Sequence, residues 1–228
     1  MKKAVIIVAG GKGIRMGADT PKQFLKLGEK PVIYHSMSAF IKYDKKIRML
    51  VGLPEGYLEE WNTICKDFSI DFDHEVIRGG DTRFHTVLNA LEKIGNHELV
   101  AIHDAVRPFV SSNTIERCFQ TAENWGTAVP CIVVPDSMRE IQDDSSFPVN
   151  RESYRMIQTP QVFKGEIIKS AYLQEFQPGF TDDASVVEQA GYDIHLVEGN
   201  KENFKITTIE DYNMACAYFK SKASYSSK

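Results

Sequence analysis

The residues best suited to chemistry lie in a glycine-rich segment that follows a short apolar run near the first residue. Its four glycines fall within eight residues and are Gly10, Gly11, Gly13 and Gly17. Because glycine has no Cβ, such a loop exposes backbone N–H groups to which a polyphosphate can bind. Arg15 and Lys22 add two cations beside it. The segment therefore predicts a phosphate-binding loop, and the alternative is an ordinary strand-to-helix turn with two surface charges.

Two better-known glycine loops do not fit this segment. A P-loop requires Gly-Lys-Ser/Thr after four residues, but Lys12 is followed by Gly13, and no hydroxyl residue is placed to hold magnesium. The dinucleotide fingerprint would place Met16 where a small residue must let helix and strand pack closely. A hydride-transfer enzyme is therefore disfavoured. A non-catalytic nucleotide-binding module remains an alternative of another class, although it would need the glycines and not several convergent cations.

Five further motifs follow the loop in order along the chain. They are Gly79-Gly80-Asp81, His103-Asp104-Ala105-Val106-Arg107-Pro108, Thr159-Pro160-Gln161, Thr181-Asp182-Asp183-Ala184-Ser185 and Asn203-Phe204-Lys205-Ile206-Thr207. Together with the loop and Pro21-Lys22, they resemble the signature of the 2-C-methyl-D-erythritol 4-phosphate cytidylyltransferase family over nearly the whole chain. The related ribitol-5-phosphate cytidylyltransferases are the alternative, because Gly10 and the motif at His103 occur there too. The motif at Thr181 favours the methylerythritol substrate.

The resemblance implies transfer of CMP from CTP to 2-C-methyl-D-erythritol 4-phosphate. The products would be pyrophosphate and 4-diphosphocytidyl-2-C-methyl-D-erythritol, an intermediate of non-mevalonate isoprenoid biosynthesis, with Mg²⁺ as cofactor. Such a reaction brings two anions together, so cations must line its path. It needs no strong general base, because a phosphate monoester is already largely dianionic at neutral pH.

The resemblance also implies roles for the residues that match the family motifs. Catalytic roles are expected for the cations Arg15, Lys22, Arg151 and Lys205. Nucleotide binding is expected of Ala9, Gly10, Gly11, Gly13, Gly80, Asp81 and Thr86. Substrate binding is expected of Asp104, Ala105, Arg107, Ser137, Thr159 and Thr181, and Asp104 is also the candidate Mg²⁺ ligand, directly or through water.

Three local interpretations accompany these roles. Asp81 is expected to be the N-cap of a helix as well as a nucleotide-binding residue. Lys205 lies between Phe204 and Ile206, whose apolar side chains would hold its stem near the site. His103 has no second histidine at ligand spacing, so a packed strand residue is expected in preference to a metal ligand.

Segments of strand-like composition alternate with helical periodicity along the chain. Strands are expected at 3–9, 47–53, 99–103 and 127–134, with further candidates at 75–78 and 193–198. Helices are expected from Phe84 to Ile94 and from Asn113 to about Gly126. This alternation predicts an α/β fold with a mostly parallel sheet flanked by helices. The resemblance implies a Rossmann-like sheet of the nucleotide-diphospho-sugar transferase type, in one domain covering residues 1–228.

Residues 136–158 depart from the alternation and are expected to form a projecting β-hairpin arm. The arm contains Ile141, Phe147, Val149 and Tyr154 but has little length for a core of its own. Packing against a second copy would stabilise it, so a homodimer is expected. The resemblance implies that Arg151 of this arm reaches the active site of the neighbouring subunit. An ordinary surface hairpin is the alternative.

Composition limits the classes of partner and location. A net charge of -4 and an isoelectric point near 5.9 offer no electrostatic footprint for nucleic acid or an anionic membrane surface. No stretch approaches the length of a membrane span. The four cysteines are widely scattered, which indicates reduced thiols and a cytoplasmic protein. The partners expected are therefore small molecules, CTP and a polyol phosphate.

Overall fold

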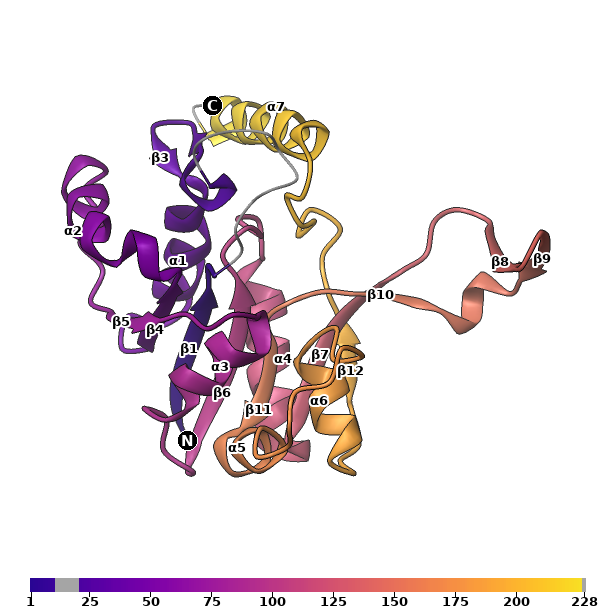
Figure 1. The fold of residues 1–228 in the computed structure, drawn as a ribbon. Coiled ribbons are helices and arrows are strands. Elements are labelled where there is room, and N and C mark those ends of the chain that lie inside the picture. The colour runs from indigo at the N-terminus through magenta and orange to yellow at the C-terminus, as the bar shows by residue number, and fades with distance from the viewer. Residues whose placement is uncertain (11–20, 227–228) are drawn as a thin grey trace.

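A central sheet with helices on both faces forms the body of the molecule (Figure 1). This computed structural model describes residues 1–10 and 21–226. Within them the sheet contains β1 (Lys2–Val8), β4 (Arg48–Leu53), β5 (Glu75–Arg78), β6 (Glu98–Asp104), β7 (Thr127–Val133), β10 (Arg155–Ile157), β11 (Gln161–Lys164) and β12 (Leu196–Glu198). Their order is β10-β7-β11-β6-β1-β4-β5, and β12 pairs with β7.

One half of the sheet is parallel, and its strands lie where the sequence predicted them. Strands β6, β1, β4 and β5 run in the same direction, so their carboxyl ends meet at one edge. The register places Val8 opposite Asp104 on one side and Gly52 on the other. The expected mostly parallel sheet is confirmed. The sequence did not predict β10 and β11, which pair antiparallel with β7.

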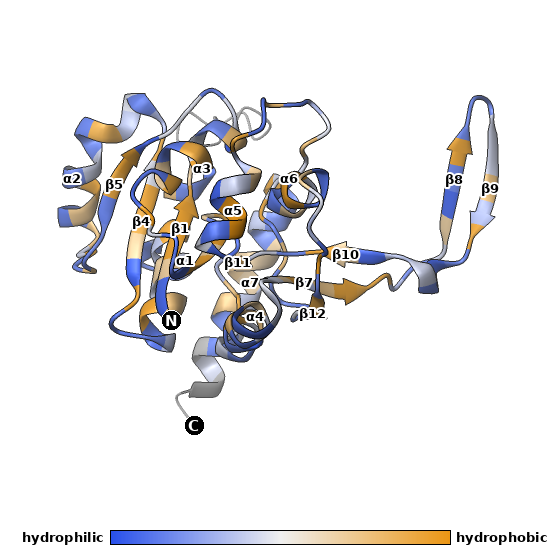
Figure 2. Cartoon of the chain, turned by 90° about the horizontal axis from the view of Figure 1, so that it is seen from below, coloured by the Kyte–Doolittle hydropathy of each residue, from blue (hydrophilic) through white to orange (hydrophobic). Residues whose placement is uncertain are grey.

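Side chains along each strand alternate between the two faces of the sheet, and a different set of helices covers each face. They are α1 (Val32–Tyr43), α2 (Leu58–Asp67), α3 (Arg83–Leu91), α4 (Ser112–Trp125), α5 (Gly165–Ala171), α6 (Asp183–Gln189) and α7 (Ile209–Ser226). On β1, Val5 and Ile7 pack in the core shared with α1, α2 and α4, whereas Ala4 and Ile6 pack in the core shared with α3, α5 and α6. Burial on both faces explains why β1 and β4 are apolar throughout most of their length (Figure 2).

The starts of two helices differ from the sequence prediction. Helix α3 is capped by Thr82, whose hydroxyl accepts a hydrogen bond from the backbone N–H of His85. The expectation that Asp81 is the N-cap is therefore wrong. Helix α4 begins at Ser112 with Ser111 as its cap, one residue before the predicted Asn113, and ends as predicted at Gly126, which has a φ of 92°.

A two-stranded hairpin projects from the sheet, as expected (Figures 1 and 2). It consists of β8 (Met138–Gln142) and β9 (Ser145–Val149), with Met138 opposite Val149. The arm is shorter than the predicted segment, because residues 155–157 form β10 and rejoin the central sheet. Ile141 is 70% exposed and Phe147 is 49% exposed in the single chain.

A smaller core lies beneath the C-terminal helix. It is formed by Leu27, Val32, Val106, Phe109, Ile206 and Ala215. The short strands β2 (Lys26–Leu27) and β3 (Lys30–Pro31) pair beside it. Among the helices of the described residues, none has both the length and the apolar character needed to cross a membrane.

Candidate functional site

Two adjoining cavities open where the parallel strands end. The first, of about 290 Å³, is lined by Val8, Ala9, Gly10, Lys22, Gln23, Asp81, Thr82, Arg83, Asp104, Ala105, Val106 and Lys205. The second, of about 240 Å³, is lined by Arg83, Asp104, Arg107, Ile157, Gln158, Thr159, Gln161, Thr181, Asp182 and Lys205. Arg83, Asp104 and Lys205 belong to both, so they form the boundary between the cavities. Ligands of open α/β sheets bind at such a strand edge.

The floor of the first cavity is held close to the sheet by backbone contacts. The N–H of Ala9 donates to the carbonyl of Gly52 at 2.9 Å, and the side chain of Gln23 donates to the carbonyl of Ala9 at 2.8 Å. A Cβ on Gly10 would lie 2.9 Å from Oγ1 of Thr86. The chain can therefore approach Thr86 this closely only because residue 10 has no side chain.

Thr86 supports this floor from beneath and does not line the cavity. Its side chain is fully buried, and its hydroxyl accepts the N–H of Gly80 at 3.1 Å and donates to the carbonyl of Thr82 at 3.1 Å. A Cβ on Gly80 would collide with the side chain of His85. Thr86 thus fixes the turn that presents Asp81 to the cavity.

Asp104 lies at the centre of a cluster of cations. Its Oδ2 is 3.0 Å from Nζ of Lys205 and 3.2 Å from Nε of Arg107, and its Oδ1 is 3.4 Å from Nε of Arg83. Burial alone would raise the pKa of Asp104, but the charges of Arg83, Lys205 and Arg107 outweigh it and hold that pKa well below its usual range. The carboxylate therefore stays ionised and holds three cations at the boundary of the two cavities.

Arg83 is in turn fixed by a residue of another helix. Its Nη1 and Nη2 donate to the two carboxylate oxygens of Asp183 at 2.8 and 2.6 Å. Asp183 is fully buried at the first position of α6 and also accepts the hydroxyl of Tyr172 at 2.7 Å. Such a two-point contact fixes the plane of the guanidinium group.

Arg83 and Asp183 were not predicted from the sequence to be functional residues. Arg83 lies two positions after Asp81, and Asp183 lies within the motif at Thr181, so both fall in or beside segments already noted. Their pairing joins residues 100 positions apart. No spacing rule for a single chain could have revealed that contact.

His103 is a packed strand residue, as predicted. It is fully buried, and burial lowers its pKa to about 4. The hydroxyl of Thr159 accepts the N–H of Asp104 at 3.1 Å and lies 3.0 Å from Nδ1 of His103. That hydroxyl therefore donates to Nδ1, and Nε2 carries the imidazole proton and donates to the carbonyl of Arg107 at 3.1 Å. His103 thus positions the segment that holds Asp104 and Arg107.

The structure brings most of the predicted site residues together. Ala9, Gly10, Lys22, Asp81, Asp104, Ala105 and Lys205 line the first cavity, and Arg107, Thr159 and Thr181 line the second. The stem of Lys205 is held as expected, because Ile206 is fully buried and Phe204 packs against Phe109. Gly11, Gly13 and Arg15 lie outside the described residues.

Four predicted residues among those described line neither cavity, namely Gly80 and Thr86 of the turn at Asp81 and Ser137 and Arg151 of the arm. Arg151 and Ser137 are exposed on the arm and line neither cavity in the single chain. The guanidinium group of Arg151 donates to the carbonyl of Pro135 at the base of the arm. In the single chain, Arg151 therefore contacts the base of its own arm and neither cavity.

The donor atoms of the site do not fit a metal ion held by the protein alone. Both oxygens of Asp104 accept contacts from cations, and the described residues include no group of three His, Cys, Asp or Glu that could hold a metal. Mg²⁺ in nucleotide sites is commonly bound by substrate phosphates with only one or two carboxylates. The described side chains alone therefore form no complete metal site.

Comparison with known proteins gives one consistent family. The model of the family described as 2-C-methyl-D-erythritol 4-phosphate cytidylyltransferase (IspD) matches residues 3–221. The chain is 48% identical over 217 residues to the enzyme of that name from Bacteroides thetaiotaomicron, in a match that covers 95% of this chain and 99% of the relative. The corresponding protein of Bacteroides fragilis is 46% identical. The crystal structure of the Thermus thermophilus enzyme has 31% identity and a TM-score of 0.79, covering 96% of this chain and 100% of that one.

Proposed function

The chain belongs to the 2-C-methyl-D-erythritol 4-phosphate cytidylyltransferase family, and from that premise we propose that it transfers CMP from CTP to 2-C-methyl-D-erythritol 4-phosphate. The products are 4-diphosphocytidyl-2-C-methyl-D-erythritol and pyrophosphate, in non-mevalonate isoprenoid biosynthesis. The observation that carries the proposal is the group of Arg83, Arg107 and Lys205 around Asp104 at the boundary of two cavities. Each cavity would receive one of the two anionic substrates.

We assign the nucleotide to the first cavity and the polyol phosphate to the second. Ala9, Gly10 and Asp81 would face the nucleotide, Gly11 and Gly13 would also bind it, and Gly80 and Thr86 would hold the turn at Asp81. Asp104, Ala105, Arg107, Thr159 and Thr181 would face the polyol. Close approach of backbone at the glycines favours a small base such as cytosine over a purine.

In the reaction, an oxygen of the polyol phosphate attacks the α-phosphorus of CTP, and the bond from that phosphorus to the β-phosphate oxygen breaks. Negative charge grows on the departing pyrophosphate, where Lys22 and Arg15 would stabilise it. Lys205 would turn from Asp104 to the phosphate of the polyol, because a dianion attracts it more strongly than a carboxylate already shared with two arginines. No protein base is needed for this step.

Mg²⁺ is the cofactor of this proposal and enters with the triphosphate. When bound, it would neutralise phosphate charge during transfer. Asp104 would contact its hydration shell at most, because the carboxylate is already held by three cations.

The proposed functional unit is a homodimer in the cytoplasm, where CTP is available. Each chain would form one domain over residues 1–228 with its arm extended to the partner. Support comes from Ile141, Phe147 and Tyr154, apolar side chains of the arm that face water in a single chain. Arg151 and Ser137 would then reach the partner's second cavity.

The proposal is tested by pyrophosphate release from CTP and Mg²⁺. Parallel reactions contain 2-C-methyl-D-erythritol 4-phosphate or D-ribitol 5-phosphate. We expect turnover with the methylerythritol compound and little with ribitol phosphate. Preference for ribitol phosphate would overturn the substrate assignment, and CTP binding without turnover on either would indicate a nucleotide-binding module.

A further inference from the structure

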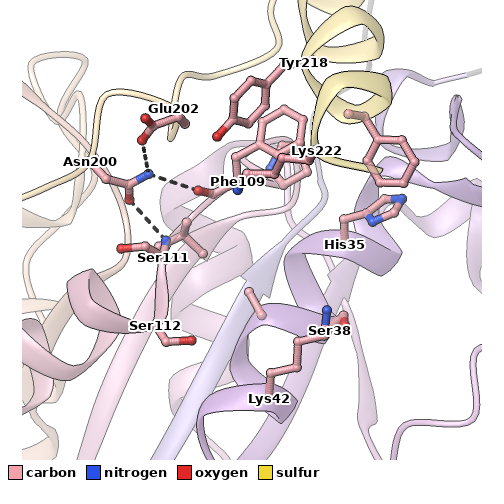
Figure 3. Close-up of a pocket in the computed structure, with 14 residues that line it drawn as sticks. His35, Ser38, Lys42, Phe109, Ser111, Ser112, Asn200, Glu202, Tyr218 and Lys222 are labelled. Carbon is pink, nitrogen blue, oxygen red and sulfur yellow. Dashed lines mark hydrogen bonds between the residues drawn. The ribbon is translucent and has the colours of Figure 1, made fainter. Parts of the chain in front are cut away.

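A third cavity lies on another part of the molecule, between α1 and α7 (Figure 3). It has a volume of about 570 Å³ and shares no lining residue with the two cavities around Asp104. Helix α1 contributes His35, Ser38 and Lys42, and α7 contributes Tyr218, Phe219 and Lys222. The volume is within the range of pockets that hold small molecules.

The lining combines cations with apolar and aromatic surface. Lys42 and Lys222 lie on opposite walls, while the carboxylate of Glu202 is already engaged by the side-chain amide of Asn200 at 3.1 Å. Phe109 contributes an apolar surface beside the ring of Tyr218, with ring centroids 4.8 Å apart. Two cations against one neutralising carboxylate favour an anionic ligand, and the rings favour an apolar group on it.

One polar side chain in this cavity has unused hydrogen-bonding capacity. Ser38 is only 8% exposed, lines the cavity, and has no hydrogen-bond partner among the described residues. Its hydroxyl can therefore donate to a ligand in the cavity. Its position on the same helix as Lys42, one turn away, places a donor beside a cation.

A network of hydrogen bonds joins this cavity to the site around Asp104. The side chain of Asn200 accepts the N–H of Ser111 and donates to the carbonyl of Phe109, each at 3.1 Å. The carbonyl of Asn200 accepts the side chain of Gln158 at 2.9 Å. The N–H of Asn200 also donates to the side-chain oxygen of Gln158 at 3.3 Å. Gln158 lines the second cavity, so these two hydrogen bonds connect the walls of the two cavities.

The network continues to the cations of the site. The side-chain amide of Asn203 donates to the backbone carbonyl of Thr159 at 2.7 Å. The backbone carbonyl of Asn203 accepts a hydrogen bond from Nη1 of Arg107 at 2.8 Å. Residues 104–111 themselves run from Asp104 to the wall of the third cavity. A ligand that moves Ser111 or Asn200 therefore acts on groups that position Arg107.

We propose that the cavity between α1 and α7 is an effector site for a small organic phosphate that carries an apolar or aromatic group. Lys42, Lys222 and Ser38 would bind the phosphate, and Phe109 and Tyr218 would contact the apolar group. Occupancy would change turnover through Asn200 and the segment from Asp104 to Ser111. Binding at this cavity does not depend on the activity proposed above.

Binding is tested with phenyl phosphate as the probe, by calorimetry on the full chain. Because the site around Asp104 also attracts phosphate, the titration uses the Lys205→Ala variant, with and without the further changes Lys42→Gln and Lys222→Gln. We expect a dissociation constant of about 1 mM or tighter. Losing two charged donors should weaken binding about tenfold or more. The matched control is Lys45→Gln with Lys220→Gln, two exposed lysines of the same region outside the cavity.

Binding that is unchanged by Lys42→Gln with Lys222→Gln, or undetectable in the Lys205→Ala background, would overturn the site. Coupling is tested separately in the protein with Lys205 intact. Phenyl phosphate should alter the rate even at saturating polyol phosphate, and Lys42→Gln with Lys222→Gln should abolish that effect. An unaltered rate at full occupancy of the cavity would overturn the coupling.

Discussion

At the scale of single residues, Asp104 holds together cations that would otherwise repel one another. Lys205 is the member of this group best able to respond to substrate, because its side chain is 41% exposed whereas that of Arg107 is 11% exposed. Its partner Asp104 is nearly buried and stays ionised. If Lys205 leaves Asp104 to bind the phosphate of the polyol, substrate binding would therefore also affect the other cations around Asp104.

Lys205→Ala should lower kcat/KM for the polyol phosphate by about 100-fold or more, because a charged donor to the reacting phosphate is lost. CTP binding should change little. Steady-state kinetics and calorimetric titration with CTP measure the two effects. The control is Lys201→Ala, which removes an exposed lysine four residues away. Equal losses in both variants would contradict the assigned role.

Asp183→Asn should destabilise the fold, because the guanidinium group of Arg83 would lose the fully buried carboxylate with which it pairs. Breaking one partner of a buried ion pair costs about 3 kcal/mol in free energy of unfolding. Urea unfolding measures this cost, with the exposed Asp193→Asn as the control. A midpoint equal to that of the control would show that the pair does not stabilise the chain.

His103 should make stability depend on pH. Its pKa in the folded chain is about 4, below its ordinary value of 6.5, so between these values the unfolded chain binds more protons. The free energy of unfolding should therefore fall as pH is lowered from 6.5 to 4, by about 3 kcal/mol at most. His103→Gln should flatten this dependence in urea titrations across the range. The exposed His97→Gln should leave it unchanged, and a matching slope in both variants would contradict the assignment.

At the scale of elements, the arm leaves apolar side chains exposed in the single chain. Strands β8 and β9 pair only with each other among the described strands, and Ile141 and Phe147 remain exposed on them. An isolated two-stranded hairpin is marginally stable in water. Packing against the proposed partner would stabilise it.

Introducing charge on the arm should dissociate the dimer. Ile141→Asp with Phe147→Asp should shift the mass measured by light scattering toward that of one 25.8 kDa chain, because burying two carboxylates is unfavourable. Circular dichroism would verify that the body remains folded. The control is Leu173→Asp, an exposed apolar residue on the body of the molecule. A dimer that persists with the arm charged would place the interface elsewhere.

At the scale of the whole molecule, the proposed site is complete only when two chains meet. Lys205 lies in the body of one chain and Arg151 on the arm. If each arm contributes Arg151 to the site in the partner's body, a mixed dimer of Lys205→Ala and Arg151→Ala chains contains one intact site. That site combines the body of the Arg151→Ala chain with the arm of the Lys205→Ala chain. Mixing equal amounts of the two impaired variants should then restore about a quarter of normal activity, since half of random dimers are mixed.

The complementation is measured by pyrophosphate release after the variants have been mixed under conditions that allow exchange of subunits. Mixing Lys205→Ala with Lys22→Ala is the control, because both changes lie in the body and every site of that mixture keeps one of them. The control mixture should therefore stay impaired. Exchange is verified separately by capture of an untagged chain on a tagged one. Exchange without recovery in the mixture containing Arg151→Ala would show that Arg151 does not act across the interface.

Much of this arrangement was predictable from local sequence. The strands at 3–9, 47–53 and 99–103 are apolar and β-branched because helices cover both faces, and Gly126 ends α4 because only a residue without Cβ easily adopts its φ of 92°. Lys205 and Asp104, which the structure brings together, could likewise be picked out, because charged residues in motifs have direct chemical meaning.

The tertiary structure alone decided what holds those groups in place. The contact of Arg83 with Asp183, the short antiparallel strands β10 and β11, and the support of Gly10 by Thr86 all join segments far apart in the chain. Residue type and periodicity report local backbone preference and burial, whereas these contacts depend on which surfaces meet after packing. The sequence by itself thus determined the chemistry available to the protein, and the folded chain decided which of those residues face one another.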